Sequence, residues 1–112
     1  MAIANLANVP GNPAEMAAWS FAHMAHHRDM ISAVRVKYAI ELPEYALDPV
    51  DLNDPGPFED NHQLMHNDLD AILGTYNYDL TSVDLTNVEQ RASWVYLNFQ
   101  SHQAEGAALG VP

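Results

Sequence analysis

Apolar and polar positions along the chain are spaced as in amphipathic helices. The first predicted helix begins at Asn12 and Pro13, because an asparagine side chain caps free amide N–H groups and proline suits the first helical turn. From there to about Val34, one helical face is apolar or histidine and the opposite face is charged or small. The inner positions are Met16, Trp19, His23, His27, Met30 and Val34.

A second helix is predicted over residues 57–73. Gly74 directly follows it, and glycine favours the left-handed conformation that ends many helices. His66 lies at the edge of its inner face. The inner positions are Phe58, His62, Met65, Leu69, Ile72 and Leu73.

The third predicted helix starts at a capping box formed by Thr86 and Glu89. Trp94 and Leu97 point away from its inner face, which suggests burial on two sides or contact with a partner. Gly106 and Gly110 indicate a frayed end. The inner positions are Val88, Ala92, Val95, Phe99 and His102.

Between the first two helices, residues 38–56 form a proline-rich segment that also carries many apolar side chains. Residues before proline favour extended conformations, so we expect an extended arm lying along a surface of this chain or of a neighbour. The segment 75–84 is turn-like and compatible with a short hairpin. The sequence therefore predicts one all-α domain over residues 1–112, with an N-terminal extension at 1–11 and a C-terminal tail at 105–112.

The charge balance restricts the partners. Fifteen Asp and Glu face four Lys and Arg, giving a formal net charge of -11. Because a phosphate-binding groove needs clustered basic residues, we expect neither nucleic acid nor anionic lipid as a partner. The acidic residues are scattered, which favours solubility over mimicry of a polyanion. The sequence has no apolar run of transmembrane length and no signal-peptide pattern, so we expect no membrane association.

Histidines carry the main candidate chemistry. His23 and His27 are four residues apart, as are His62 and His66, so each pair shares a helical face. With His102, these residues are candidate nitrogen ligands for Zn or Cu. The pattern lacks a catalytic partner, because a zincin would need glutamate at the position of Gln63. Interior histidines also occur in hydrogen-bonded core networks, and on the sequence alone we favour that interpretation, with no cofactor.

Several segments resemble small proteins encoded by tailed bacteriophages, for which no activity is assigned. They are WSFAH at 19–23, HHRD at 26–29, LDPV at 47–50, HQLMHND at 62–68, DLTSVD at 79–84 and ASWVYLNFQSH at 92–102. The resemblance spans most of the chain, from about 12 to 109. It implies a structural or assembly component of the phage particle, made in the host cytoplasm and located in the virion, with no catalytic residues to carry over.

Two functions therefore stand as hypotheses. The first is a virion component, such as a head decoration, connector or tail-associated subunit, that binds other virion proteins or copies of itself and is not an enzyme. The residues expected to make its protein contacts are Tyr38, Tyr45, Leu47, Trp94 and Leu97. The alternative is a histidine-rich helical enzyme or sensor that binds Zn or Cu.

Overall fold

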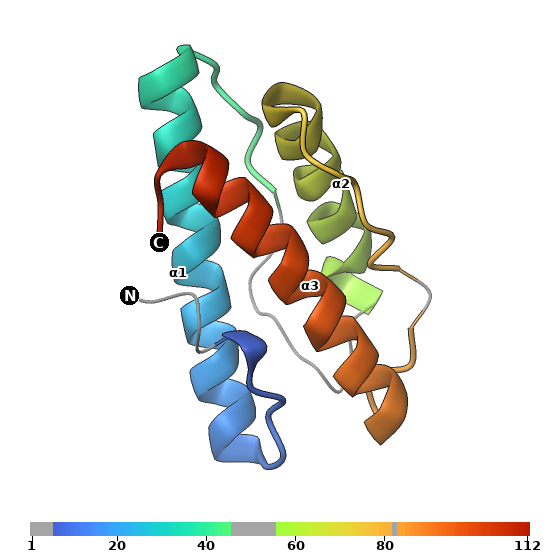
Figure 1. Cartoon of the computed structure of the whole chain (residues 1–112). Coiled ribbons are helices and arrows are strands. Elements are labelled where there is room, and N and C mark those ends of the chain that lie inside the picture. Colours follow the sequence, from blue (N-terminus) through green and yellow to red (C-terminus); the bar gives the residue numbers. More distant parts are fainter. Residues whose placement is uncertain (1–5, 46–55, 82) are drawn as a thin grey trace.

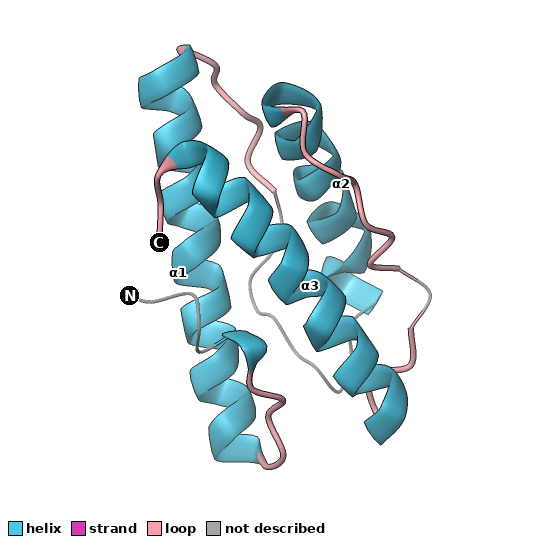
Figure 2. Ribbon diagram, viewed as in Figure 1, coloured by secondary structure: helices cyan, strands magenta, loops and turns pink. Residues whose placement is uncertain are grey.

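The computed structural model describes residues 6–45, 56–81 and 83–112. Three helices make up the fold: α1 (Pro13–Tyr38), α2 (Gly56–Leu73) and α3 (Val88–Leu109). Figures 1 and 2 show α3 crossing in front of α1 and α2. The described residues contain no strand, so the predicted all-α class is confirmed. None of the helices in these ranges is long and apolar enough to cross a membrane.

Helix α1 starts as predicted and ends later than predicted. The Asn12 side chain accepts a hydrogen bond of 2.9 Å from the backbone N–H of Glu15, which caps the helix. The helix passes Val34 and stops at Ala39, whose φ of 55° is left-handed. No proline or glycine interrupts residues 35–38, and the basic side chain of Lys37 suits the negative end of the helix dipole.

Helix α3 differs from its prediction at both ends. Its N-cap is Asn87 and not Thr86, because the Thr86 hydroxyl donates instead to Asp84 at 2.6 Å. The helix continues through Gly106 to Leu109, so residues 105–109 of the predicted tail are helical. It ends at Gly110, where φ is 71°.

The predicted short hairpin is not formed by the described residues of 75–84. The segment instead runs back along α2 and is held by side chains, among them Asp70, which accepts from Thr75 and Asn77, and Gln63. The Gln63 amide donates to the carbonyl of Tyr78 at 3.1 Å and accepts from the N–H of Leu80 at 2.7 Å. A side-chain amide thus replaces the backbone partner that a second strand would have supplied.

Two apolar clusters occupy the two ends of the bundle. The first consists of Leu6, Trp19, Ala22, Leu80, Leu85, Trp94 and Val95. The second consists of Met24, Met30, Val34, Met65, Leu69 and Leu109. Along α1 and α3, the histidines lie between residues of these two clusters. The backbones of α1 and α2 each pack against α3 but stay apart from one another in the described part of the chain.

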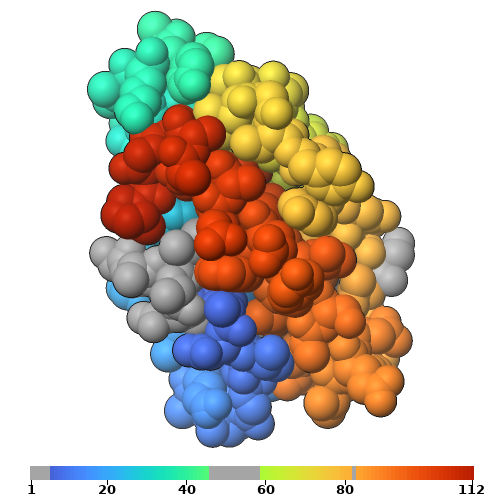
Figure 3. Space-filling model, viewed as in Figure 1, coloured from blue at the N-terminus to red at the C-terminus, as the bar shows by residue number. Residues whose placement is uncertain are grey.

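The inner face of α3 is wider than the predicted inner face. Val95 and His102 are fully buried as predicted, and Trp94 is buried beside them, which agrees with burial on two sides. Trp94, expected to point away, is only 3% exposed, and its indole N–H donates to the Leu80 carbonyl at 3.0 Å. Val88, expected inside, is 74% exposed because it lies in the first turn, beyond the packed region. Leu97 is half-buried against the first cluster. Figure 3 shows α3 as a diagonal ridge between the blue N-terminal segment and the yellow segment after α2.

The predicted extended arm is described only in part. Residues 39–45 are neither helix nor strand. Tyr45 packs against the second cluster, and its hydroxyl donates to Asp68 at 2.6 Å. Tyr38 is the last residue of α1 and is 45% exposed. Residues 46–55, including Leu47, lie outside the described residues.

Candidate metal centre

Histidines from all three helices meet in the layer between the apolar clusters. The i, i+4 spacing places two on α1 and two on α2 toward the interior, and α3 contributes one. Each of these side chains is at most 1% exposed. They are His23, His27, His62, His66 and His102.

The Nε2 atoms of these rings converge. Nε2 of His102 lies 3.0 Å from Nε2 of His23 and 3.0 Å from Nε2 of His27. Nε2 of His62 lies 3.3 Å from that of His23 and 3.1 Å from that of His66. One ligand nitrogen from each of the five rings lies within 4.8 Å of all the others.

These separations match those around a transition-metal ion. Metal–nitrogen bonds of about 2.1 Å place neighbouring nitrogens about 3.4 Å apart in a tetrahedron and about 3.0 Å apart in an octahedron. The closest contacts in the cluster, from 3.0 to 3.3 Å, fall in this range. Opposite ligands in an octahedron are about 4.2 Å apart, so five-fold coordination requires at most a small inward shift of the widest pair.

Hydrogen bonding alone does not satisfy this arrangement. The Nε2 atom of a neutral imidazole carries either one hydrogen or one lone pair, so Nε2 of His102 must either share one hydrogen between His23 and His27 or accept from both with one lone pair. Buried atoms without a partner surround the cluster: Nδ1 of His23, Nδ1 of His27 and Nδ2 of Asn98. A cation at the centre would bind all five lone pairs at once, which no assignment of hydrogens achieves.

The electrostatics keep the rings neutral. Burial lowers the pKa values of His23, His27, His62 and His102 well below the usual histidine value, and the neighbouring rings lower them further. Burial likewise lowers the pKa of His66 to about 3. Neutral imidazoles present lone pairs, which is the state that a metal ion requires.

A buried carboxyl group orients His66. Nδ1 of His66 lies 2.8 Å from Oε2 of Glu105, which is fully buried, and 3.1 Å from the Ser101 hydroxyl. Burial, together with a hydrogen bond to Asp70 and the charge of Asp70, raises the pKa of Glu105 to about 10. With His66 neutral as well, the contact in the metal-free protein is a hydrogen bond between uncharged groups. Carboxylate–histidine pairs of this kind commonly fix the ring orientation of metal ligands.

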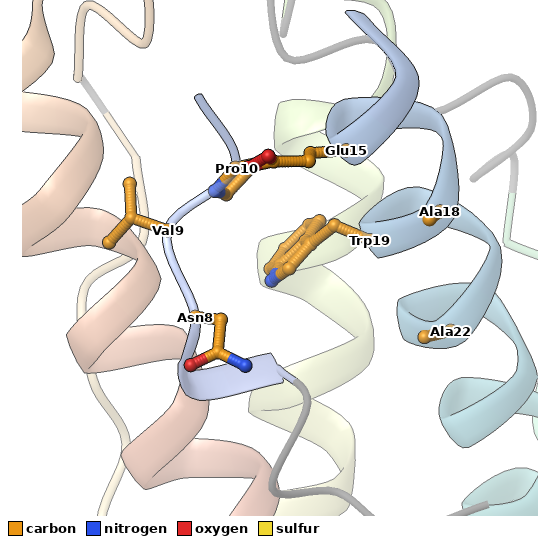
Figure 4. A pocket seen from close by; sticks show the side chains of 7 residues that line it. All are labelled: Asn8, Val9, Pro10, Glu15, Ala18, Trp19 and Ala22. Carbon is orange, nitrogen blue, oxygen red and sulfur yellow. The ribbon is translucent and has the colours of Figure 1, made fainter. Parts of the chain in front are cut away.

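Tryptophan side chains close one end of the cluster. The ring of Trp19 lies 4.5 Å from that of His23, and the ring of Trp94 lies 5.6 Å from that of His62, measured between centroids. On its other side, Trp19 lines a pocket with the N-terminal segment. Figure 4 shows this side chain among Asn8, Pro10 and Ala22. The indole therefore separates the pocket from the histidines.

All five histidines considered as candidate ligands are thus brought together. His66, expected at the edge of its helical face, is fully inside. Asp68, which lies on α2 two residues after His66, accepts from Tyr45. The carboxylate beside the cluster is Glu105, which the sequence had placed in the tail.

Two polar residues near the cluster were missed. His26 is 4% exposed, and Asn98 is fully buried with Oδ1 at 3.1 Å from Nε2 of His23. Asn98 was missed because the sequence does not show how wide the buried face of α3 is. His26 was missed because its burial on α1 depends on packing against His102 of α3. Comparison with family models, curated proteins and solved structures finds no match to this chain.

Proposed function

We propose that this protein binds one late first-row transition-metal ion, Zn²⁺ or Cu²⁺, through the five converging histidines. The observation that carries the proposal is the set of Nε2–Nε2 separations of 3.0–3.3 Å between fully buried rings of three helices. Imidazole nitrogen suits both ions, and the chain has no cysteine that would favour a thiolate site. Among divalent ions, Cu²⁺ is expected to bind most tightly.

The proposed role is structural binding and not catalysis. A catalytic zinc site keeps a coordination position open to substrate, whereas a closed site uses its ligands to hold the fold. Here each ligand is at most 1% exposed and the ligands come from three helices. An ion at this place would cross-link α1, α2 and α3 at their midpoints, so metal binding would contribute directly to folding.

Metal content per chain tests the proposal. Untagged protein, purified without chelators or nickel resin, is analysed by elemental mass spectrometry and by titration of the stripped protein with Zn²⁺ and Cu²⁺. We expect about one ion per chain, with much weaker binding in His102→Leu. The matched control is Gln103→Leu, the same replacement at the next, exposed position of α3. Absence of binding by the stripped, folded wild type would reject a metal function.

A second proposal follows from the resemblance to tailed-phage proteins, namely a role in particle assembly. It is supported by large apolar side chains that remain exposed on this chain. They are Phe21 at 71%, Val36 at 79%, Tyr76 at 72%, Val88 at 74% and Tyr96 at 62%. Such surfaces are common at protein contacts, and a metal-stiffened domain would suit this role.

Assembly is tested by two measurements. Light scattering coupled to size-exclusion chromatography gives the mass in solution, and mass spectrometry of purified particles shows whether the chain is present. Oligomers or incorporation into particles would support the assembly role. A monomer that is absent from particles would exclude it and leave the metal proposal unaffected.

A further inference from the structure

The sixth histidine lies just outside the converging set. Nδ1 of His26 is 2.8 Å from Nδ1 of His102, a hydrogen-bond distance between two ring nitrogens. His26 is 4% exposed, and its ring centroid lies 5.0 Å from that of His102. Since the Nε2 atom of His102 faces the other histidines, the two sides of the His102 ring have different partners.

This contact limits where hydrogen can reside. Two neutral rings facing each other through Nδ1 need one hydrogen between them, so one ring donates and the other accepts. If His102 donates, its Nε2 is bare and its lone pair points into the cluster. If His26 donates, His102 carries hydrogen on Nε2 and cannot bind a metal in that state. The tautomer of His26 therefore decides that of His102.

The C-terminal turn sets the tautomer of His26. A Cβ atom at Gly106 would lie 3.2 Å from Nε2 of His26 and 2.5 Å from the carbonyl oxygen of Val111. The His26 nitrogen and the Val111 oxygen therefore both border the space that this glycine leaves empty. The turn is fixed by the N–H of Val111, which donates to the Gly106 carbonyl at 2.8 Å, and by Gly110 with φ 71°. A carbonyl oxygen only accepts, so it favours hydrogen on Nε2 of His26, although it forms no full hydrogen bond with that atom.

We propose that His26 is a positioning residue that holds His102 in the tautomer with a bare Nε2, and that the turn at residues 106–111 holds His26. The order of contacts runs from the Val111 carbonyl to His26, from His26 to His102, and from His102 into the cluster. The lone pair is thereby oriented before an ion arrives. This inference rests on the proposed metal function for its consequence, but the tautomer itself is a property of the metal-free protein.

The experiment compares wild type with two variants of His26. His26→Asn keeps an acceptor oxygen near the position of Nδ1, whereas His26→Leu removes it. Long-range ¹⁵N–¹H NMR spectra of metal-free protein report the tautomer of His102, and competition with a chelator gives the Zn²⁺ affinity. Circular dichroism establishes that each variant is folded.

We expect hydrogen on Nδ1 of His102 in wild type and in His26→Asn, and a mixture of tautomers in His26→Leu. The Zn²⁺ affinity should fall about 10- to 100-fold in His26→Leu and only a few-fold in His26→Asn, as for other residues that orient metal ligands. Hydrogen on Nε2 of His102 in metal-free wild type would overturn the inference. Equal losses of affinity in both variants would also overturn it, since they would indicate a packing role.

The two proposals fail separately. If wild type binds no metal, the proposed function is wrong, and the NMR spectra still decide whether His26 sets the tautomer of His102. If His26→Leu does not fold, the wild-type and His26→Asn spectra decide the same question. If metal binds and the tautomer is the opposite one, the metal function stands and the role of His26 is rejected.

Discussion

The apolar clusters and the histidine layer are buried to a similar degree, yet their partners differ. In the second apolar cluster, Met30, Met65 and Leu69 are fully buried by neighbouring side chains of this chain. In the histidine layer, equally buried atoms such as Nδ1 of His27 have no hydrogen-bond partner. Apolar burial needs only shape and volume, whereas polar burial needs a partner for each atom. The apolar regions are thus complete within the chain, whereas the histidine layer keeps unpaired polar atoms. An ion would satisfy the converging Nε2 atoms and would leave Nδ1 of His27 without a partner.

The largest expected difference between the two regions is the response of their stability to pH, because the titratable groups lie in and beside the histidine layer and not in the apolar clusters. The unfolded histidines titrate near 6.5 and the buried rings have lowered pKa values, so their stabilising contribution is present above about 6.5 and lost as pH falls. When the pH falls from 7.5 to 5.5, each ring lowers the free energy of unfolding by about 1.4 kcal/mol, and the five rings together lower it by about 7 kcal/mol. Glu105, with its pKa raised to about 10, contributes in the opposite direction, because it stays protonated in the folded protein while the unfolded carboxyl group is ionised. Over the same fall in pH it adds about 2.7 kcal/mol to the free energy of unfolding.

For these six groups the net prediction is a loss of about 4 kcal/mol in the free energy of unfolding of the metal-free protein between pH 7.5 and 5.5, and His26, whose pKa burial also lowers, adds to this loss. Urea titrations monitored by circular dichroism at both pH values measure it. A flat profile would show that the rings are not neutral and buried together.

The next largest expected effect is a loss of stability on truncating a side chain of the second apolar cluster. Leu69→Ala removes a fully buried side chain of the second cluster and should lower the free energy of unfolding by about 3 kcal/mol. Because the histidine geometry is untouched, the folded variant should still bind about one Zn²⁺ with near wild-type affinity. The control is Leu64→Ala on the same helix, where the side chain is 48% exposed and little change is expected. Loss of metal binding in folded Leu69→Ala would show that the two regions are not independent.

Binding of Zn²⁺ to the histidine layer should stabilise the folded protein. At a free concentration 100 times the dissociation constant, Zn²⁺ should raise the free energy of unfolding by about 2.7 kcal/mol. Thermal unfolding with and without Zn²⁺ measures the gain, and a chelator should reverse it. His102→Leu should show little gain, whereas the exposed-site control Gln103→Leu should behave as wild type. A wild-type midpoint that does not move with Zn²⁺ would contradict a folded-state site.

The smallest effect concerns the residue that orients His66. Glu105→Gln keeps the size of the side chain but removes the ionisable carboxyl group. That group is uncharged in the metal-free protein and would support a donating Nδ1–H as a carboxylate once an ion is bound, so Zn²⁺ affinity should fall about 10-fold, or about 1.4 kcal/mol. Ser101→Ala removes the weaker contact at 3.1 Å and should have a smaller effect. Chelator competition measures both. If Glu105→Gln and Ser101→Ala lowered the Zn²⁺ affinity equally, Glu105 would not be the residue that orients His66.

Much of the helical structure was predictable from local signals. Asn12 and Pro13 marked the start of α1, and Gly74 marked the end of α2, because caps act within a few residues. The inward position of His23 and His62 also followed from helical spacing. These features depend on one segment at a time, so one sequence is enough to find them.

The convergence of the histidines was not predictable for a physical reason. Periodicity gives the inner face of each helix but not the crossing angle or the relative heights, which decide whether two faces bring their histidines together. Trp94 shows the same limit, since its burial depends on packing against Leu80. Of the two glycines interpreted as the helix end, Gly110 does end α3, whereas Gly106 lies inside the helix and leaves room for the His26 ring.

The separation of α1 and α2 has a mechanical consequence. Their backbones do not meet, and His62 reaches His23 across the space between them. In the described part of the chain, α1 and α2 are therefore joined through side chains: the imidazole layer and the second apolar cluster, which takes residues from both helices. An ion bound by the imidazole layer would hold α1 and α2 together more strongly, and protonation of its rings would hold them less strongly. A domain built this way could convert a change in its chemical surroundings into a change of stiffness, with no change of fold.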